Sequence, residues 1–219
     1  MRKRLLAGRT ALAMTLIAGG VLLTAAPASA SGCGGAVPAG SNCTMTGTVN
    51  VTGGSLTLTA SSSLTWAATL SGLDQSVVDV VAGDQQLTVD DATGTGAGWH
   101  VTTSATTFTN GSHILPNAGT FVLTGSVSSI SATSAPTATC SATCTLPTNT
   151  ATYPVSITTA ATSPTPVTIY DTSAGSGLGQ VVIGGSSAAN PVGWWVNLPA
   201  SAVAGSYTST ITMAIVSAP

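Results

Sequence analysis

Short runs rich in Val, Ile, Thr and aromatic residues recur along the chain, and Gly, Pro, Asn and Ser separate them. Such residues favour extended backbone, because β-branched and aromatic side chains pack well on a pleated surface. No stretch beyond residue 30 shows the apolar spacing of an amphipathic helix. The pattern predicts an all-β fold, which we expect to be a β-sandwich with Greek-key-like connections, Ser/Thr/Gly-rich loops and no substantial helix.

The clearest strand lies near the C-terminal end. Apolar side chains occupy one parity there and threonines the other: Tyr207, Ile211, Met213 and Ile215 against Thr208, Thr210 and Thr212. A period of two predicts one buried face and one hydroxylated face. Similar runs predict strands at 45–51, 55–59, 76–81, 85–90, 98–103, 120–127, 152–158, 166–170, 179–184 and 193–197. Segments 128–150 and 172–185, which are rich in small and polar residues, are expected to be excursions.

The N-terminal segment is typical of export. It has four basic residues, an apolar stretch and a small-residue motif: Arg2, Lys3, Arg4 and Arg9; residues 11–23; and Ala28-Ser29-Ala30. This order predicts a secretory signal peptide over 1–30, and the apolar stretch is shorter than the ~20 residues of a membrane span. The alternatives are an uncleaved anchor, or lipidation of Cys33, which Ala30-Ser31-Gly32-Cys33 matches loosely.

Beyond residue 30 the chain contains no Lys, Arg or Glu. Its acidic residues there are six aspartates: Asp74, Asp79, Asp84, Asp90, Asp91 and Asp171. Loss of the four cations changes the formal net charge from −2 to −6. Nucleic-acid binding needs cations to neutralise phosphates, so this partner is excluded. The same lack argues against an electrostatic hold on an anionic membrane, and no membrane span is expected.

The four cysteines predict disulfides, because they are even in number in a chain that carries an export signal. Three connectivities are possible. We expect the two local pairs, Cys33–Cys43 and Cys140–Cys144, since each pair lies in one polar, turn-rich segment. On the chain-entropy model each short loop contributes about 2–3 kcal/mol. A redox role for Cys140 and Cys144 is the alternative, although their spacing is one residue longer than C-x-x-C.

Catalytic and metal-binding patterns are sparse. His100 and His113 are the two histidines, and neither lies near a G-x-S-x-G nucleophile motif. Asp90-Asp91 lacks the alternating acids and distal Glu of an EF-hand, so we expect these carboxylates to cap a turn through Asx-type hydrogen bonds rather than to bind calcium. The sequence therefore predicts no catalytic residues, no metal site and no cofactor.

Tryptophans supply most of the large aromatic surface. We expect Trp99 to be a core residue, because a tryptophan inside a sandwich is usually buried. Trp194 and Trp195 are adjacent, and neighbours on a strand point to opposite faces, so this pair is a candidate for stacking on sugar.

The two halves of the chain show a faint internal echo. Gly98-Trp99-His100-Val101 precedes Ala118-Gly119-Thr120-Phe121, and Gly193-Trp194-Trp195-Val196 precedes Ala204-Gly205-Ser206-Tyr207. Each half thus contains a glycine–tryptophan strand, an Ala-Gly turn and an aromatic-led strand. The pattern suggests an internal duplication.

Two segments resemble the signatures of the WxL surface domain. The first is Leu87-Thr-Val-Asp-Asp-Ala-Thr-Gly-Thr-Gly-Ala-Gly-Trp99-His100-Val101, with Val101 where the family has Leu. The second runs from Ala204 to Pro219 and places Tyr207 before Met213 and Ile215, where the family has Trp and Leu. The resemblance covers roughly 45–219 and implies a wall-binding motif of Trp99, His100, Val101, Tyr207, Met213 and Ile215.

The resemblance also implies a function. WxL domains attach non-covalently to the peptidoglycan of Gram-positive cells, often with other surface proteins. We therefore expect a secreted, non-enzymatic module on the cell wall, with a Cys-containing segment at 31–44 and a WxL-like sandwich at 45–219 that carries a Ser/Thr/Pro-rich insertion at 128–150. The alternative is a structural or adhesive coat protein that self-associates, because uncharged sheet edges invite pairing.

Overall fold

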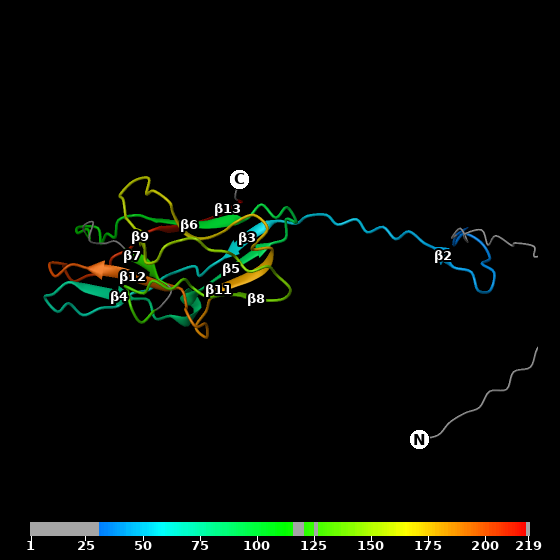
Figure 1. Ribbon diagram of the computed structural model, residues 1–219. Coiled ribbons are helices and arrows are strands. Elements are labelled where there is room, and N and C mark those ends of the chain that lie inside the picture. Colours follow the sequence, from blue (N-terminus) through cyan, green and yellow to red (C-terminus); the bar gives the residue numbers. More distant parts are fainter. Residues whose placement is uncertain (1–30, 116–120, 125–126, 218–219) are drawn as a thin grey trace, which may run out of the picture. The chain divides into compact units, whose positions relative to one another are not determined.

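The computed structural model describes residues 31–115, 121–124 and 127–217, so the expected signal peptide lies outside the described residues (Figure 1). The chain divides into two units, up to Asn50 and from Val51 onward. In the first unit, β1 (Ser31–Gly32) and β2 (Cys43–Thr44) form a short parallel pair, and a disulfide joins Cys33 to Cys43. Among the described residues, no helix is long and apolar enough to cross a membrane.

The second unit is built from strands, with a single turn of 3-10 helix among the described residues. Its elements are β3 (Leu56–Thr59), β4 (Gln75–Val78), η1 (Ala82–Gln85), β5 (Gln86–Asp91), β6 (Trp99–Ala105), β7 (Phe121–Thr124), β8 (Ala138–Cys140), β9 (Val155–Ile157), β10 (Val167–Thr172), β11 (Gly179–Gly184), β12 (Gly193–Leu198) and β13 (Ile211–Ser217). The predicted all-β fold is confirmed.

These strands form three antiparallel sheets (Figure 1). The first sheet has the order β10-β6-β13, the second β3-β5-β11-β8, and the third β4-β12-β7-β9. Residues of β13 lie against β3, and residues of β10 lie against β9, so the first sheet borders both others. The three sheets together enclose one core.

That core is made of the inward-facing residues of central strands. Val89 on β5, Val101 on β6 and Ile183 on β11 are completely buried, and Trp99 and Trp194 are the largest fully buried side chains. Burial alternates along β9, where Val155 and Ile157 are buried and Ser156 is exposed. The period of two therefore places the apolar residues inside and the hydroxyl residues outside, in a sandwich-like arrangement.

Two strand predictions fail. Residues 45–51 alternate between apolar and polar side chains, yet they form no strand in the structure. β8 lies inside 128–150, where an excursion was expected, and it pairs with β11 through Thr139 and Val182. The Ala-Thr-Cys sequence of β8 has little strand preference of its own, so we attribute its extended conformation to pairing with β11.

The two glycine–tryptophan strands occupy equivalent places. β6 is the central strand of the first sheet, and β12 lies between β4 and β7 in the third. β12 belongs to the second half and pairs with β7 of the first half. β6 belongs to the first half and pairs with β13 of the second half. The halves are thus interlocked through their hydrogen bonds, and the duplication itself stays a prediction.

Two buried tyrosines give the fold a pH limit. The Tyr153 hydroxyl donates to the Ile169 carbonyl at 2.8 Å, and the Tyr170 hydroxyl donates to the Pro136 carbonyl at 3.4 Å. Loss of hydration on burial raises the pKa of Tyr170 to about 12 and raises the pKa of Tyr153 well above its usual range. Both side chains therefore stay neutral in the folded protein at pH values where an unfolded tyrosine has begun to ionise.

We predict that this contribution to stability is complete below about pH 10, the pKa of an unfolded tyrosine, and is lost as the pH rises towards 12. Tyr170 alone accounts for on the order of 2–3 kcal/mol across this range. Urea unfolding at a series of alkaline pH values measures the loss. Tyr170→Phe removes one ionisable group, so its unfolding free energy should fall less steeply, and an unchanged slope contradicts the assignment.

Candidate functional site

The two signature segments of the sequence lie side by side. β6 and β13 are antiparallel neighbours, and their register pairs Trp99 with Ser217, His100 with Val216 and Val101 with Ile215. Met213 lies opposite Thr103 on the same ladder. Main-chain pairing therefore brings Met213 and Ile215 onto the same ladder as Trp99, His100 and Val101, although more than a hundred positions separate the two strands in the chain. Tyr207 precedes β13 and is not on this ladder.

Their side chains divide between the two faces of the sheet. Trp99 and Val101 are fully buried, and Met213 and Ile215 are half-buried against the same core. His100 alternates with them and belongs to the opposite face of β6, where it is half-buried opposite Asp171 of β10. Most of the predicted binding motif is thus a core element, and its direct contribution is to hold β6 and β13 together.

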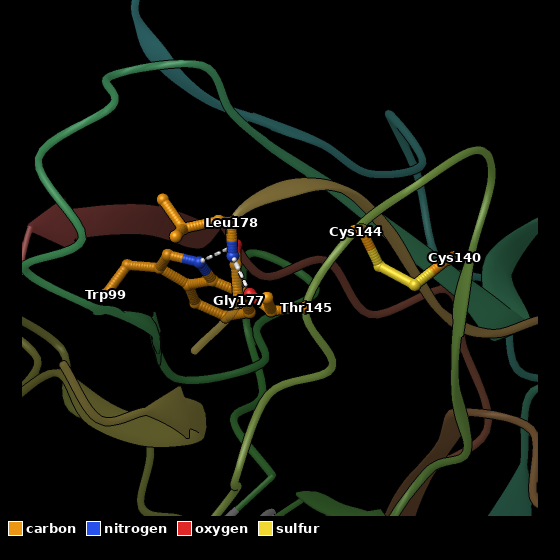
Figure 2. Close-up of a disulfide and its surroundings, with 6 residues drawn as sticks. All are labelled: Trp99, Cys140, Cys144, Thr145, Gly177 and Leu178. Atoms are coloured by element: carbon orange, nitrogen blue, oxygen red, sulfur yellow. Dashed lines mark hydrogen bonds between the residues drawn. A yellow bond between two sulfur atoms is a disulfide. The ribbon is translucent and has the colours of Figure 1, made fainter. Parts of the chain in front are cut away.

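Trp99 is fixed by a loop that a disulfide supports (Figure 2). The Trp99 indole Nε1 donates to the Gly177 carbonyl at 3.0 Å, and the ring stacks on Tyr170 with centroids 6.3 Å apart. Thr145 holds the same loop, because its carbonyl accepts from the Gly177 amide and its Oγ1 accepts from the Leu178 amide. The Cys140–Cys144 disulfide lies just before Thr145 in the chain.

Both disulfides are the local pairs that the sequence predicts, Cys33–Cys43 and Cys140–Cys144, and no described cysteine is free. The Cys140–Cys144 loop packs closely on the glycine-rich turn. A side chain at Gly179, which has φ +84°, would meet Cys144 Cβ at 3.2 Å. The disulfide loop therefore supports the turn that covers Trp99.

The other three tryptophans also use their indole N–H groups inside the protein. Trp66 donates to the Trp194 carbonyl at 3.1 Å, Trp194 to the Asp84 carbonyl at 2.9 Å, and Trp195 to Thr124 Oγ1 at 3.2 Å. Trp194 and Trp195 are both buried. The structure corrects the prediction that this pair stacks on sugar, because neither ring presents a free face.

Trp194 belongs to the core, whereas Trp195 lies on the opposite face of β12, outside that cluster, and is still only 7% exposed. The Trp195 indole N–H donates to Thr124 of the neighbouring strand β7. The sequence rule that neighbours on a strand point to opposite faces holds, but it does not reveal whether the outer face is covered.

A groove of about 970 Å³ lies beside β13 in the second unit, and Trp66, Phe108, Tyr207 and Met213 are among the residues that line it. Trp66 meets Phe108 edge to face, with ring centroids 5.8 Å apart. Segments 60–70 and 202–209 supply most of the lining residues. Two residues of the predicted motif, Tyr207 and Met213, therefore line a cavity that sequence reasoning did not anticipate.

The groove is uncharged throughout. None of its lining residues is Asp, Glu, Lys, Arg or His, and eight of them are Ser or Thr: Ser61, Ser62, Ser63, Thr65, Thr69, Ser206, Thr208 and Ser209. A lining that combines apolar and hydroxyl-bearing side chains suits a neutral ligand that has both apolar and hydrogen-bonding groups. A charged ligand would find no countercharge there.

Asp91 and Asp79 accept hydrogen bonds from main-chain amides. Asp91 accepts from the Thr93 amide at 3.1 Å and from Thr93 Oγ1 at 2.6 Å, which is the predicted Asx-type turn. Buried Asp79 accepts from the amides of Thr65 and Val81. Burial, with the nearby Asp84, raises the pKa of Asp79. Among the described residues, no group of three or more His, Cys, Asp or Glu is placed to hold a metal ion.

Comparison with known proteins decides the family. The chain matches the family described as "WxL domain surface cell wall-binding" over residues 42–219. The chain belongs to the WxL domain family. No curated protein and no solved structure matches the chain. As a WxL domain it is a module of the cell surface that binds the cell wall, which confirms the resemblance and the predicted location.

The departures of this WxL domain from the second signature keep the apolar character of the inner face of β13. Met213 and Ile215 replace the Trp and Leu of the second motif, and both keep an apolar side chain on the inner face of β13. The structure also adds residues that the signatures omit. Gly177 and Thr145, which hold Trp99, lie far away in the sequence, and the φ of Gly177 could not be inferred from composition.

We predict that Gly177→Ala destabilises this WxL domain more than Gly175→Ala does. Both glycines have positive φ, +73° and +81°, so an alanine at either costs about 1–2 kcal/mol of backbone strain. At Gly177 the new Cβ would also meet Trp99 Nε1 and Thr172 Cγ2 at 2.7 Å, whereas nothing lies within 4 Å at Gly175. The clash adds about 1–3 kcal/mol.

Chemical denaturation of the two variants measures the difference, and Trp99 fluorescence reports the local change. Equal losses of unfolding free energy would mean that the loop moves aside and does not hold the tryptophan.

Proposed function

We propose that this WxL domain binds peptidoglycan through the uncharged groove, as a non-covalent, non-catalytic module of the cell surface. The observation that carries the proposal is the chemistry of the groove beside β13, whose described lining residues are apolar or hydroxyl-bearing and include no charged side chain. Family membership supports the wall as the target. Its volume of about 970 Å³ is within the range of ordinary ligand sites.

The neutral glycan of the wall is the part that fits this groove. Sugar rings carry apolar faces and many hydroxyls, so they match aromatic residues such as Trp66 and Tyr207 together with Ser and Thr. Anionic polymers of the wall are poor ligands, because the chain beyond residue 30 has six Asp and no cation. Binding energy must come from buried apolar area and hydrogen bonds, which depend little on salt.

We predict that binding to isolated walls stays constant or strengthens as salt increases. The long-range force between an acidic domain and anionic wall polymers is repulsive, and salt shortens its reach to about 8 Å at physiological ionic strength. Sedimentation with purified walls, with and without their anionic polymers, measures this dependence. A steep loss of binding between low and moderate salt would point to an ionic contact and would contradict the proposal.

We also predict that filling the groove abolishes binding. Ala204 is exposed and lines the groove, so Ala204→Trp places a ring inside it without removing a core residue. Ala189 is exposed and lies outside the groove, which makes Ala189→Trp the matched control. Sedimentation with peptidoglycan should show binding weakened at least about tenfold for the first variant only, a loss of about 1.4 kcal/mol. Equal binding by both variants, with equal melting temperatures, would exclude the groove as the wall-binding site.

A further inference from the structure

A segment with the pattern of a strand has no strand partner. Residues 45–51 alternate between Met45, Gly47, Val49 and Val51 on one parity and threonines and Asn50 on the other. The relative exposures of Met45, Val49 and Val51 are 84%, 83% and 87%. The segment contains neither Pro nor charge, so nothing in it opposes strand addition.

The second unit has six sheet edges, and four of them face another sheet. β13 lies against β3, and β10 lies against β9. The remaining edges are those of β4 and β8. β8 has three residues and leads directly into the Cys140–Cys144 loop, whereas β4 pairs only with β12 among the described strands. β4 is therefore the edge with room for another strand.

Apolar side chains border the β4 edge on the surface. The relative exposures of Leu73 and Val80 are 71% and 73%, and Leu70 and Val81 are also exposed. A second hollow, of about 510 Å³, is lined by Thr65, residues 67–69, β4 itself, Val80 and Val81. An added strand gains affinity from main-chain hydrogen bonds and specificity from pockets that take alternate side chains. This edge offers both features.

We propose that Met45–Val51 of one molecule adds as a strand to the β4 edge of a second copy of this chain. Geometry favours a second copy over the same molecule. The Gly54 amide donates to the Ala92 carbonyl, and the Ala92 amide donates to the Ser55 carbonyl, so the residues just before β3 are fixed beside the end of β5. The segment leading into β3 enters the second unit at one end, and β4 lies at the opposite end (Figure 1).

The resulting contact joins different surfaces of the two molecules. The donor is residues 45–51 and the acceptor is the β4 edge, so each added copy leaves one donor and one acceptor unused. Such a head-to-tail contact continues into open chains instead of closing as a symmetric dimer. This inference does not rest on the proposed function, because strand addition uses the main-chain groups of β4, and neither Val49 nor Val80 lines the groove.

Three variants with the same change in charge test the proposal in the secreted form of the protein. Val49→Asp places a carboxylate in the donor, and Val80→Asp places one beside the acceptor edge. Val216→Asp places one on another exposed apolar residue, which lies on β13. Analytical ultracentrifugation over a range of concentrations measures the assembly. We expect the unmodified chain and Val216→Asp to form chains that lengthen with concentration.

Val49→Asp and Val80→Asp should each weaken assembly at least about tenfold, because a buried, unpaired carboxylate is costly. Mixing them is decisive. The first variant keeps an intact acceptor and the second an intact donor, so the mixture should form one-to-one dimers and nothing larger.

Several outcomes overturn the proposal. An unmodified chain that stays monomeric at every concentration excludes it, and slow hydrogen exchange at 45–51 in that monomer would show pairing within one molecule. Equal disruption by Val216→Asp would indicate general apolar association. If Val49→Asp or Val80→Asp assembles as strongly as the unmodified chain, the contact lies elsewhere. A mixture of the two variants that grows beyond dimers would lead to the same conclusion.

Discussion

Buried indole N–H groups that donate to backbone carbonyls hold the second unit together. A domain with no Lys or Arg beyond residue 9 cannot use cation–carboxylate pairs to connect its loops to its sheets. Hydrogen bonds from large buried rings take that place. Trp99 connects β6 to the turn at Gly177, Trp194 connects β12 to η1 at Asp84, and Trp66 connects the 60–70 segment to Trp194. Each ring contributes apolar burial and fixes a remote loop with its single donor.

Much of the secondary structure could be predicted because it depends on local pattern. Alternation predicted β13 with Ile211, Met213 and Ile215 inward, and the turn at Asp91 followed from the short reach of an Asx hydrogen bond. Proximity of the cysteines in the chain was enough to favour the two disulfides. In each case the interacting groups lie within a few residues of one another.

What the sequence could not predict depends on contacts between remote segments. The register that pairs Val101 with Ile215 is set by the whole sheet, and the burial of Trp194 and Trp195 depends on what covers β12. β8 is extended because it pairs with β11, and its own sequence does not indicate this pairing. The groove beside β13 is formed by two loops, 60–70 and 202–209, that share no motif. Conversely, residues 45–51 have the local pattern of a strand but no partner within the described chain.

The absence of cations has two opposite consequences for this WxL domain. It removes long-range attraction to anionic polymers, so recognition must rely on close contact with neutral groups. It also removes the lysines that natural sheet edges use against unwanted pairing. The proposed recognition of neutral glycan and the proposed strand addition therefore both depend on the same uncharged composition. The same composition supports both wall binding and self-assembly.

The two surfaces share one wall. Val77 of β4 lines both the groove beside β13 and the hollow beside β4, and so do Thr65 and residues 67–69, which form most of this shared wall. Two hydrogen bonds fix it from the inside: Trp66 Nε1 to the Trp194 carbonyl, and the Thr65 amide to Asp79. Both anchors are in the third sheet or directly after β4, so the segment is held by the same strands that an added strand would extend. A substitution at Thr65 or at residues 67–69 would therefore alter both surfaces, whereas Ala204 lines only the groove and Val80 lines only the hollow beside β4.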